Sequence, residues 1–222
     1  MTAQPRAAGL GARDTWMALS FALGSICFLV GPFPRYADLV GPTVDAVTFF
    51  AGSVLFTAGG ALQTWAASPA RHDRGAGRAA WWAALTQSAG TLFFNVSTFR
   101  AMQVVLSDPH YDRLVWRPDL FGSVCFLISG VIAYRVAPRH GWLPARGGAG
   151  WWQPAVDLLG CVFFGISAIA AYVLPSTGSM VDETVANVNT CAGAACFLAC
   201  ALAGLRPRAE ASGGDSKLHR KA

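Results

Sequence analysis

Four polar side chains recur at helical spacing within the third of the chain's long apolar stretches. Residues three or four positions apart share one face of a helix, so these four would form a single polar stripe. They are Gln87, Thr91, Asn95 and Thr98. Amides and hydroxyls in such a stripe can hydrogen-bond a neighbouring membrane helix, or they can line a path for a small solute. The sequence favours the first interpretation and leaves the second open.

The six cysteines could in principle bind a metal or undergo redox chemistry, and all of them fall within apolar stretches. Cys196 and Cys200 are four residues apart, a spacing that puts both thiols on one helical face. No second pair of this kind accompanies them, and all four histidines fall in predicted loops or in the tail. We therefore expect the cysteines to act as small apolar filler. The sequence predicts no metal site and no cofactor.

Two acidic residues stand near the predicted starts of apolar stretches, Asp119 directly after Pro118 and Asp157 three residues after Pro154. Proline in the first turn of a helix loses no hydrogen bond, and a carboxylate there complements the positive end of the helix dipole. We interpret both residues as helix starters rather than proton carriers. The signatures of zinc hydrolases, serine hydrolases and phosphate-binding loops are absent from the sequence, so it predicts no catalytic residues.

The stretches that carry these residues are long and nearly free of charge. The chain is 54% hydrophobic and 13% charged, whereas a soluble domain has about 25% charged residues. A helix needs roughly 17–25 apolar residues to cross about 30 Å of hydrocarbon. We therefore predict an all-α integral membrane protein, with a flexible cytoplasmic lead at 1–14, a six-helix membrane domain at 15–205 and a disordered basic tail at 206–222. The six transmembrane helices are expected at about 15–32, 43–66, 79–106, 118–136, 151–174 and 183–205.

One five-residue phrase occurs once in each stretch: glycine, a small residue, two further residues and phenylalanine. Its glycines are Gly24, Gly52, Gly90, Gly122, Gly160 and Gly193. Small residues allow membrane helices to approach closely, so we expect these glycines at helix contacts, and the step from Cys161 to Gly165 should add another. Successive helices run in opposite directions, so we expect a packed waist with phenylalanines on both sides of it. Phe28, Phe94 and Phe164 should lie towards the outside, and Phe56, Phe126 and Phe197 towards the inside.

The net charge of +5 indicates membrane orientation rather than nucleic-acid binding, because the basic residues follow the predicted loops. If the N-terminus is cytoplasmic, 13 of the 17 Lys and Arg residues fall on that side, and only Arg35, Arg100, Arg113 and Arg117 fall outside. Such a bias in short loops is typical of cytoplasmic segments. All tryptophans except Trp116 also lie near the cytoplasmic ends of the helices. We expect a multi-pass protein of the cell membrane with both termini in the cytoplasm.

The phrase also carries a family resemblance. Residues 18–63 contain Gly24-Ser25-Ile26-Cys27-Phe28 and Gly52-Ser53-Val54-Leu55-Phe56, and a second such pairing occurs at 119–172. In these segments the chain resembles the YrhK-like membrane proteins, whose domain pairs two membrane helices with Gly-Ser-x-x-Phe centres. The resemblance implies a multi-pass membrane protein of unassigned function, and it implies no catalytic or binding residues.

These observations favour a non-enzymatic structural or interaction protein. Its partners would be the lipid bilayer and either another membrane protein or a second copy of the chain. One alternative is a small-solute channel or transporter that uses the polar stripe of the third helix. A second alternative is a membrane enzyme or redox component. A packed midplane between the helices would favour the structural role, and a hollow one would favour the channel or transporter.

Overall fold

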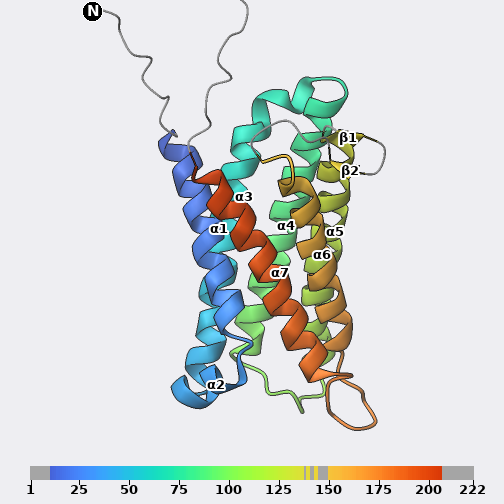
Figure 1. Cartoon of the computed structure of the whole chain (residues 1–222). Coiled ribbons are helices and arrows are strands. Elements are labelled where there is room, and N and C mark those ends of the chain that lie inside the picture. Colours follow the sequence, from blue (N-terminus) through green and yellow to red (C-terminus); the bar gives the residue numbers. More distant parts are fainter. Residues whose placement is uncertain (1–10, 138, 141–142, 145–149, 207–222) are drawn as a thin grey trace, which may run out of the picture.

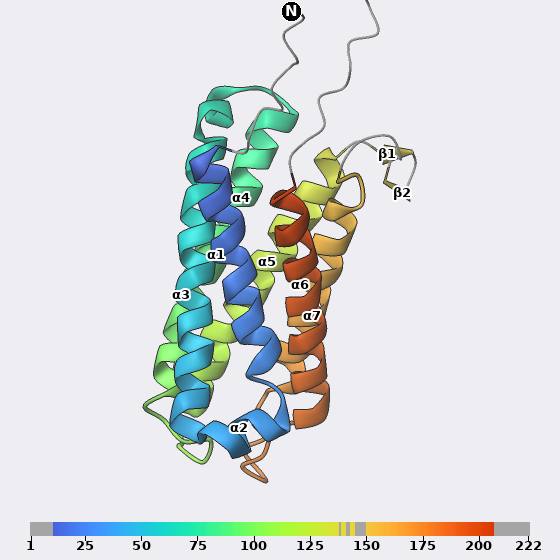
Figure 2. The same ribbon diagram turned by 60° about the vertical axis from the view of Figure 1, so that its left-hand side comes forward.

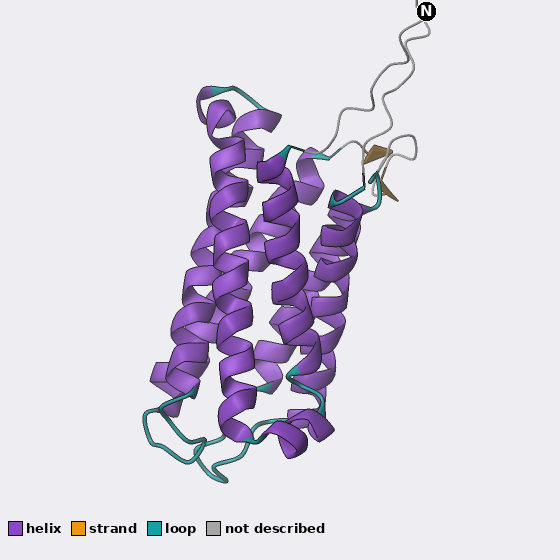
Figure 3. Cartoon of the chain, turned by 90° about the vertical axis from the view of Figure 1, so that its left-hand side faces the viewer, coloured by secondary structure: helices purple, strands orange, loops and turns teal. Residues whose placement is uncertain are grey.

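A computed structural model describes residues 11–137, 139–140, 143–144 and 150–206. Within this part, long helices run side by side along one direction, and loops lie at the two ends (Figures 1 and 3). The long helices are α1 (Ala12–Val30), α3 (Pro42–Ala67), α4 (Ala76–Ala101), α5 (Arg117–Val136), α6 (Gln153–Ala170) and α7 (Glu183–Gly204). The short elements are the helix α2 (Pro34–Val40), a 3-10 turn (Ser68–His72), a π turn (Asp112–Trp116) and the paired strands β1 (Arg139–His140) and β2 (Leu143–Pro144).

The long helices form a ring in chain order. Each packs against the long helices before and after it, and α7 packs back against α1 (Figure 2). The most extensive contacts are those within three hairpins, which we name hairpin I (α1–α3), hairpin II (α4–α5) and hairpin III (α6–α7). The first helix of each hairpin runs away from the end where both described termini lie, and the second returns to it (Figure 1).

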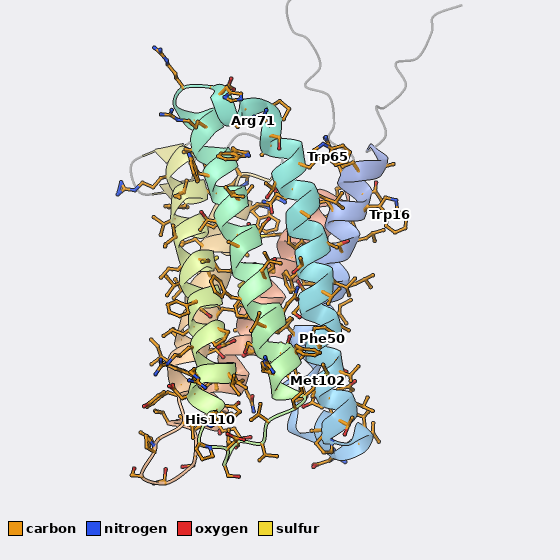
Figure 4. The ribbon with its side chains drawn as sticks, turned by 180° about the vertical axis from the view of Figure 1, so that it is seen from behind. Trp16, Phe50, Trp65, Arg71, Met102 and His110 are labelled. Atoms are coloured by element: carbon orange, nitrogen blue, oxygen red, sulfur yellow. The ribbon has the colours of Figure 1, made fainter. Side chains whose placement is uncertain are left out.

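The two ends of the bundle differ in charge. We name the basic end for the arginines that it carries, which include Arg13, Arg71 and Arg206, and the opposite end is the far end. Figure 4 places Trp16 and Trp65 towards the basic end, and Met102 and His110 towards the far end. Trp16 and Trp65 are exposed, and the guanidinium of Arg13 stands 6.0 Å from the centre of a Trp65 ring. Exposed tryptophans at one level are typical of a membrane–water boundary.

Five segments are long and apolar enough to cross a membrane, judged by length and composition. They are Ala12–Val30, Pro42–His72, Asp112–Val136, Gln153–Ala170 and Glu183–Gly204. Large aliphatic side chains on these segments point outward, as at Leu23 and Ile169. A soluble bundle would turn such residues inward, so the outward direction favours a lipid environment. The helix α4 is not one of the five, although it has 26 residues and occupies a full place in the ring.

The phrase glycines lie where the two helices of each hairpin cross. The facing pairs are Gly24–Gly52, Gly90–Gly122 and Gly160–Gly193. A Cβ atom added to one glycine of each pair would stand 3.0–3.1 Å from the carbonyl oxygen of the other. Any larger residue would therefore push the two backbones apart. The small residue after each glycine is buried as well: Ser25, Ser53, Thr91, Ser123, Cys161 and Ala194.

The six phrase phenylalanines fill the axis of the ring, and we name them the aromatic plug. Each is 2–6% exposed, and together they form the main part of the hydrophobic core. The ring centroids of Phe28, Phe94 and Phe164 are 5.9–6.5 Å apart and form a triangle on the far side. Those of Phe56, Phe126 and Phe197 are 5.7–6.4 Å apart and form a second triangle towards the basic end. Within each hairpin the two phrase rings are 5.0–5.6 Å apart.

Two predicted helix ends are wrong. The helix α4 ends at Ala101 rather than 106, because the Met102 and Gln103 amides bond three residues back and close the last turn. By then its 26 residues span about 39 Å at ~1.5 Å per residue. The helix α6 ends at Ala170 rather than 174, because Val173 pairs with Met180 in an antiparallel bridge.

Other predictions also need adjustment. The remaining bounds of the long helices differ from the predicted ones by at most three residues, and α2 was not predicted. Gly165 makes no close contact, since an added Cβ atom would have nothing within 4 Å. It follows Phe164, and one helical residue is a rotation of about 100°, which turns Gly165 away from the axis. The predicted disordered tail falls almost wholly outside the described residues, as does most of the predicted lead.

Candidate functional site

The polar stripe of α4 divides between two surroundings. The amide nitrogen Nδ2 of Asn95 donates a hydrogen bond to Oγ1 of Thr57 at 2.9 Å. The hydroxyls of Thr98 and Ser53 lie 2.9 Å apart. Both contacts join α4 to α3, and bonds of this kind stabilise helix pairs in membranes. The polarity of this part of α4 is therefore used for packing against its neighbour.

The other two stripe residues lie nearer the axis. Thr91 is fully buried and donates to the Ser88 carbonyl oxygen at 2.7 Å. Gln87 is 9% exposed, and its side chain has no hydrogen-bond partner among the described residues. The stripe separates because each four-residue step adds about 40° of rotation, so Asn95 is turned about 80° from Gln87. The structure does not bring the four predicted residues together as one surface.

Gln87 occupies a position that faces the axis in every long helix. It stands three residues before the phrase glycine and seven, or two turns, before the phrase phenylalanine, so all three share one face. The six residues at this position are Phe21, Phe49, Gln87, Asp119, Asp157 and Thr190. In hairpin I both are aromatic and extend the aromatic plug: the rings of Phe21 and Phe56 are 5.8 Å apart, and those of Phe49 and Phe28 are 5.5 Å apart. In hairpins II and III all four are polar.

Asp157 is the carboxylate on the basic side of the aromatic plug. The first turn of α6 holds no acidic residue, so the interpretation of Asp157 as a helix starter is wrong. It is half-buried, and it lies close enough to interact electrostatically with the thiols of Cys161, Cys196 and Cys200. Its carboxylate has no hydrogen bond and no ion pair within the described part of the chain. The sequence signal was its spacing from Gly160 and Phe164, which puts it on the axis-facing side.

Asp119 is the matching carboxylate on the far side of the plug. It stands in the first turn of α5, as expected for a helix starter. Its neighbour Tyr111 precedes the apolar segment Asp112–Val136, and burial together with the Asp119 charge raises the pKa of Tyr111 to about 12. The equivalent residue of α7, Thr190, shares a hydrogen bond of 2.7 Å with Ser167. Polar groups therefore stand on both sides of the aromatic plug.

The cysteines do not form a metal or disulfide site among the described residues. All six thiols are free. No group of three His, Cys, Asp or Glu side chains is placed to hold a metal ion in this part of the chain. Three cysteines instead pack on glycines of the hairpin partner. An added Cβ atom on Gly52 would lie 2.7 Å from the Cβ atom of Cys27, and the corresponding distances are 3.0 Å for Gly90 and Cys125 and 3.1 Å for Gly160 and Cys196.

Comparison with known proteins gives no further assignment. No protein-family model matches the chain, no curated protein matches it, and no solved structure matches it. The resemblance to the YrhK-like proteins therefore stays a prediction from the sequence.

Proposed function

We propose that this chain is a multi-pass cell-membrane protein of the YrhK-like type that spans the bilayer six times, with both termini in the cytoplasm. Its proposed role is structural: a rigid scaffold or interaction partner within the membrane rather than an enzyme. The observation that carries this proposal is the aromatic plug. Six phenylalanine rings occupy the axis at the level of the phrase glycines, where a permanently open channel would need a polar lining.

The sixth span in this proposal is α4. Its position between α3 and α5 over the length of the bundle supports this assignment. Its lower hydropathy has a local cause, because Asn95 and Thr98 hydrogen-bond to α3 instead of facing lipid. Its outward side chains are apolar, as at Leu92 and Val96. Hydrogen-bonded polar groups between helices are compatible with a transmembrane position.

The topology can be tested with single introduced cysteines. Arg74→Cys stands before α4 and Val105→Cys after it, and the native thiols all lie within long helices. In intact cells a membrane-impermeant maleimide should label Val105→Cys, and it should label Arg74→Cys only after permeabilisation. The unsubstituted protein serves as the control for background labelling. Equal accessibility of the two positions in intact cells would contradict a spanning α4.

The scaffold role can be tested in liposomes and in cells. Liposomes that contain the wild-type protein should show no more flux of small neutral solutes or ions than protein-free liposomes. A photo-crosslinking residue at an outward position such as Leu92 or Ile169 should crosslink the protein in native membranes to one defined partner. The product should have the same mass in repeated experiments, and the partner should be a second copy of the chain or another membrane protein. Solute flux through the wild-type protein would favour the channel alternative. Absence of an adduct from every outward position would contradict the interaction role.

A further inference from the structure

We propose that the axis between the aromatic plug and the basic end holds a binding site for a small monovalent cation, formed by the Asp157 carboxylate with the side-chain amides of Gln87 and Gln63. The site is independent of the scaffold role, because it occupies one side of the plug and needs no path through it. Its three residues come from α6, α4 and α3, so it would connect all three hairpins.

The register of the parallel helices places Gln87 and Asp157 at one level. The helices α4 and α6 run in the same direction, and the rings of Phe94 and Phe164 lie 5.9 Å apart on the axis. Gln87 and Asp157 each stand seven residues before these rings, so both are about two turns nearer the basic end on the axis-facing side. The equivalent residue of α1 is Phe21, whose ring packs on Phe56. On the α1 side, the proposed site is therefore bounded by an aromatic ring.

Gln63 approaches the same region from the opposite direction. It follows Phe56 by seven residues on α3, which runs towards the basic end, so it too lies on the axis-facing side. Helical side chains lean towards the N-terminus of their own helix, which brings Gln63 back towards the plug and carries Gln87 and Asp157 away from it. The next residue of α3, Thr64, donates to the Ala84 carbonyl oxygen at 3.0 Å and lies 2.7 Å from the Ser88 hydroxyl. Gln63 therefore stands at about the level of Gln87.

All three side chains have unused hydrogen-bonding capacity. The Oε1 atom of Gln63 is buried without a partner. Gln87 is nine-tenths buried and Asp157 is half-buried. Neither side chain makes a hydrogen bond within the described part of the chain, and their polar atoms keep some accessible surface. Buried polar groups in native proteins are nearly always satisfied, and an unpaired group calls for an ion, a water molecule or a ligand. Ionisable residues inside membrane helices mark functional sites for the same reason.

The chemistry of the three groups selects the ligand class. One carboxylate and two amide oxygens supply hard oxygen donors and a single negative charge. This charge balances one positive charge, whereas calcium sites usually combine several carboxylates. An anion would be repelled by Asp157. The nearby cysteine thiols would favour soft metals, but no three-residue metal group exists among the described residues. Sodium, potassium and ammonium share the required chemistry.

The test is thermal unfolding of the purified full chain in nanodiscs, followed by tryptophan fluorescence. The medium would contain NaCl, KCl or NH4Cl, with N-methylglucamine chloride making up constant ionic strength. A ligand that binds only the folded state raises the unfolding temperature with the logarithm of its concentration. We expect one of the three small cations to give this rise and N-methylglucamine, which is too large, to give none. The identity of that cation distinguishes a metal ion from an ammonium group.

Variants assign the effect to the site. Asp157→Asn should abolish the cation-dependent rise, and Gln87→Leu should weaken the apparent affinity roughly tenfold or more, as expected for loss of a hydrogen bond to a charge. The matched control is Asp119→Asn, the carboxylate at the equivalent position beyond the plug, which should keep the rise. If Asp157→Asn does not fold, the second measurement is saturable binding of the same cation to the wild-type protein, with an apparent affinity roughly tenfold or more weaker in Gln87→Leu. Equal response to all salts, a rise retained in Asp157→Asn, or a rise lost in Asp119→Asn would overturn the proposal.

Discussion

Gly90 and Gly122 meet backbone to backbone where α4 crosses α5. A Cβ atom on Gly90 would lie 3.0 Å from the Gly122 carbonyl oxygen, and one on Gly122 would lie 3.1 Å from that of Gly90. The obstruction is reciprocal and involves main-chain atoms, which cannot rotate away as a side chain can. The closeness of the two helices therefore depends on both residues remaining glycine.

Replacing Gly122 with alanine should destabilise the protein. The added methyl group would be forced against the Gly90 carbonyl and a Phe94 ring, and overpacking of this kind typically costs about 1–3 kcal/mol. The measurement is the unfolding midpoint in detergent. The control is Gly165→Ala, where an added Cβ has nothing within 4 Å, and its midpoint should not fall. A Gly122→Ala protein as stable as Gly165→Ala would show that α4 and α5 are not closely packed where they cross.

Loss of a ring from the aromatic plug should cost more than loss of one from the outer surface. Phe126 is 2% exposed and touches rings of α3, α4, α6 and α7, whereas Phe93 is exposed. Phe126→Ala would leave a cavity, and such changes cost roughly 3–5 kcal/mol. Phe93→Ala should cost clearly less, because lipid chains can fill the space. Chemical or thermal unfolding of both variants in one detergent makes the comparison, and equal losses would argue against a packed axis.

The α3–α4 contact should show a modest coupling energy. Asn95 donates to Thr57 at 2.9 Å, yet its Oδ1 atom is buried without a partner. Hydrogen bonds between membrane helices average about 0.6 kcal/mol in double-mutant cycles. A cycle with Asn95→Leu and Thr57→Val should give a favourable coupling of this size. A coupling of zero would indicate that the amide has another use, such as the solute path that the sequence left open.

Tyr111 should titrate late, and Asp119 should be part of the reason. Burial is the larger cause of its raised pKa of about 12 and the Asp119 charge the smaller one. Asp119→Asn should therefore lower the Tyr111 pKa without returning it to 10. The measurement is tyrosinate absorbance, with Tyr111→Phe identifying the signal. An unchanged Tyr111 pKa in Asp119→Asn would show that the two groups do not interact.

The same shift predicts a direction for stability at high pH. Folded Tyr111 keeps its proton to about pH 12, whereas the unfolded side chain loses it near its ordinary value of 10.0. Between these values the folded state binds more protons than the unfolded state, so this contribution to stability falls as pH rises through that range. Tyr111→Phe should flatten that part of the pH profile of unfolding.

The sequence predicted the all-helical architecture, because uncharged stretches of membrane length leave the backbone few other choices. It also predicted on which side of the phrase glycines Phe28 and Phe56 lie. Each phenylalanine follows its glycine by four residues, and the direction of the helix then determines the side. The course of α4 beyond Ala101 could not be predicted, because no residue there breaks a helix and the end depends on backbone bonds in the loop. The hydrogen-bond partner of Asn95 could not be predicted either. Its bond to Thr57 depends on which helix packs beside α4, and composition does not determine this.

The closed ring has a consequence for how the protein is made. The helix α1 leaves the ribosome well before α7, yet the two are neighbours, and the thiol of Cys191 donates to the Leu29 carbonyl oxygen at 3.5 Å where they meet. Until α7 has been made, the side of α1 that will contact α7 lacks this partner and must be covered by lipid or by a membrane chaperone. A ribosome that stalls before Glu183 would leave an open horseshoe in the bilayer, with the aromatic rings accessible from its gap.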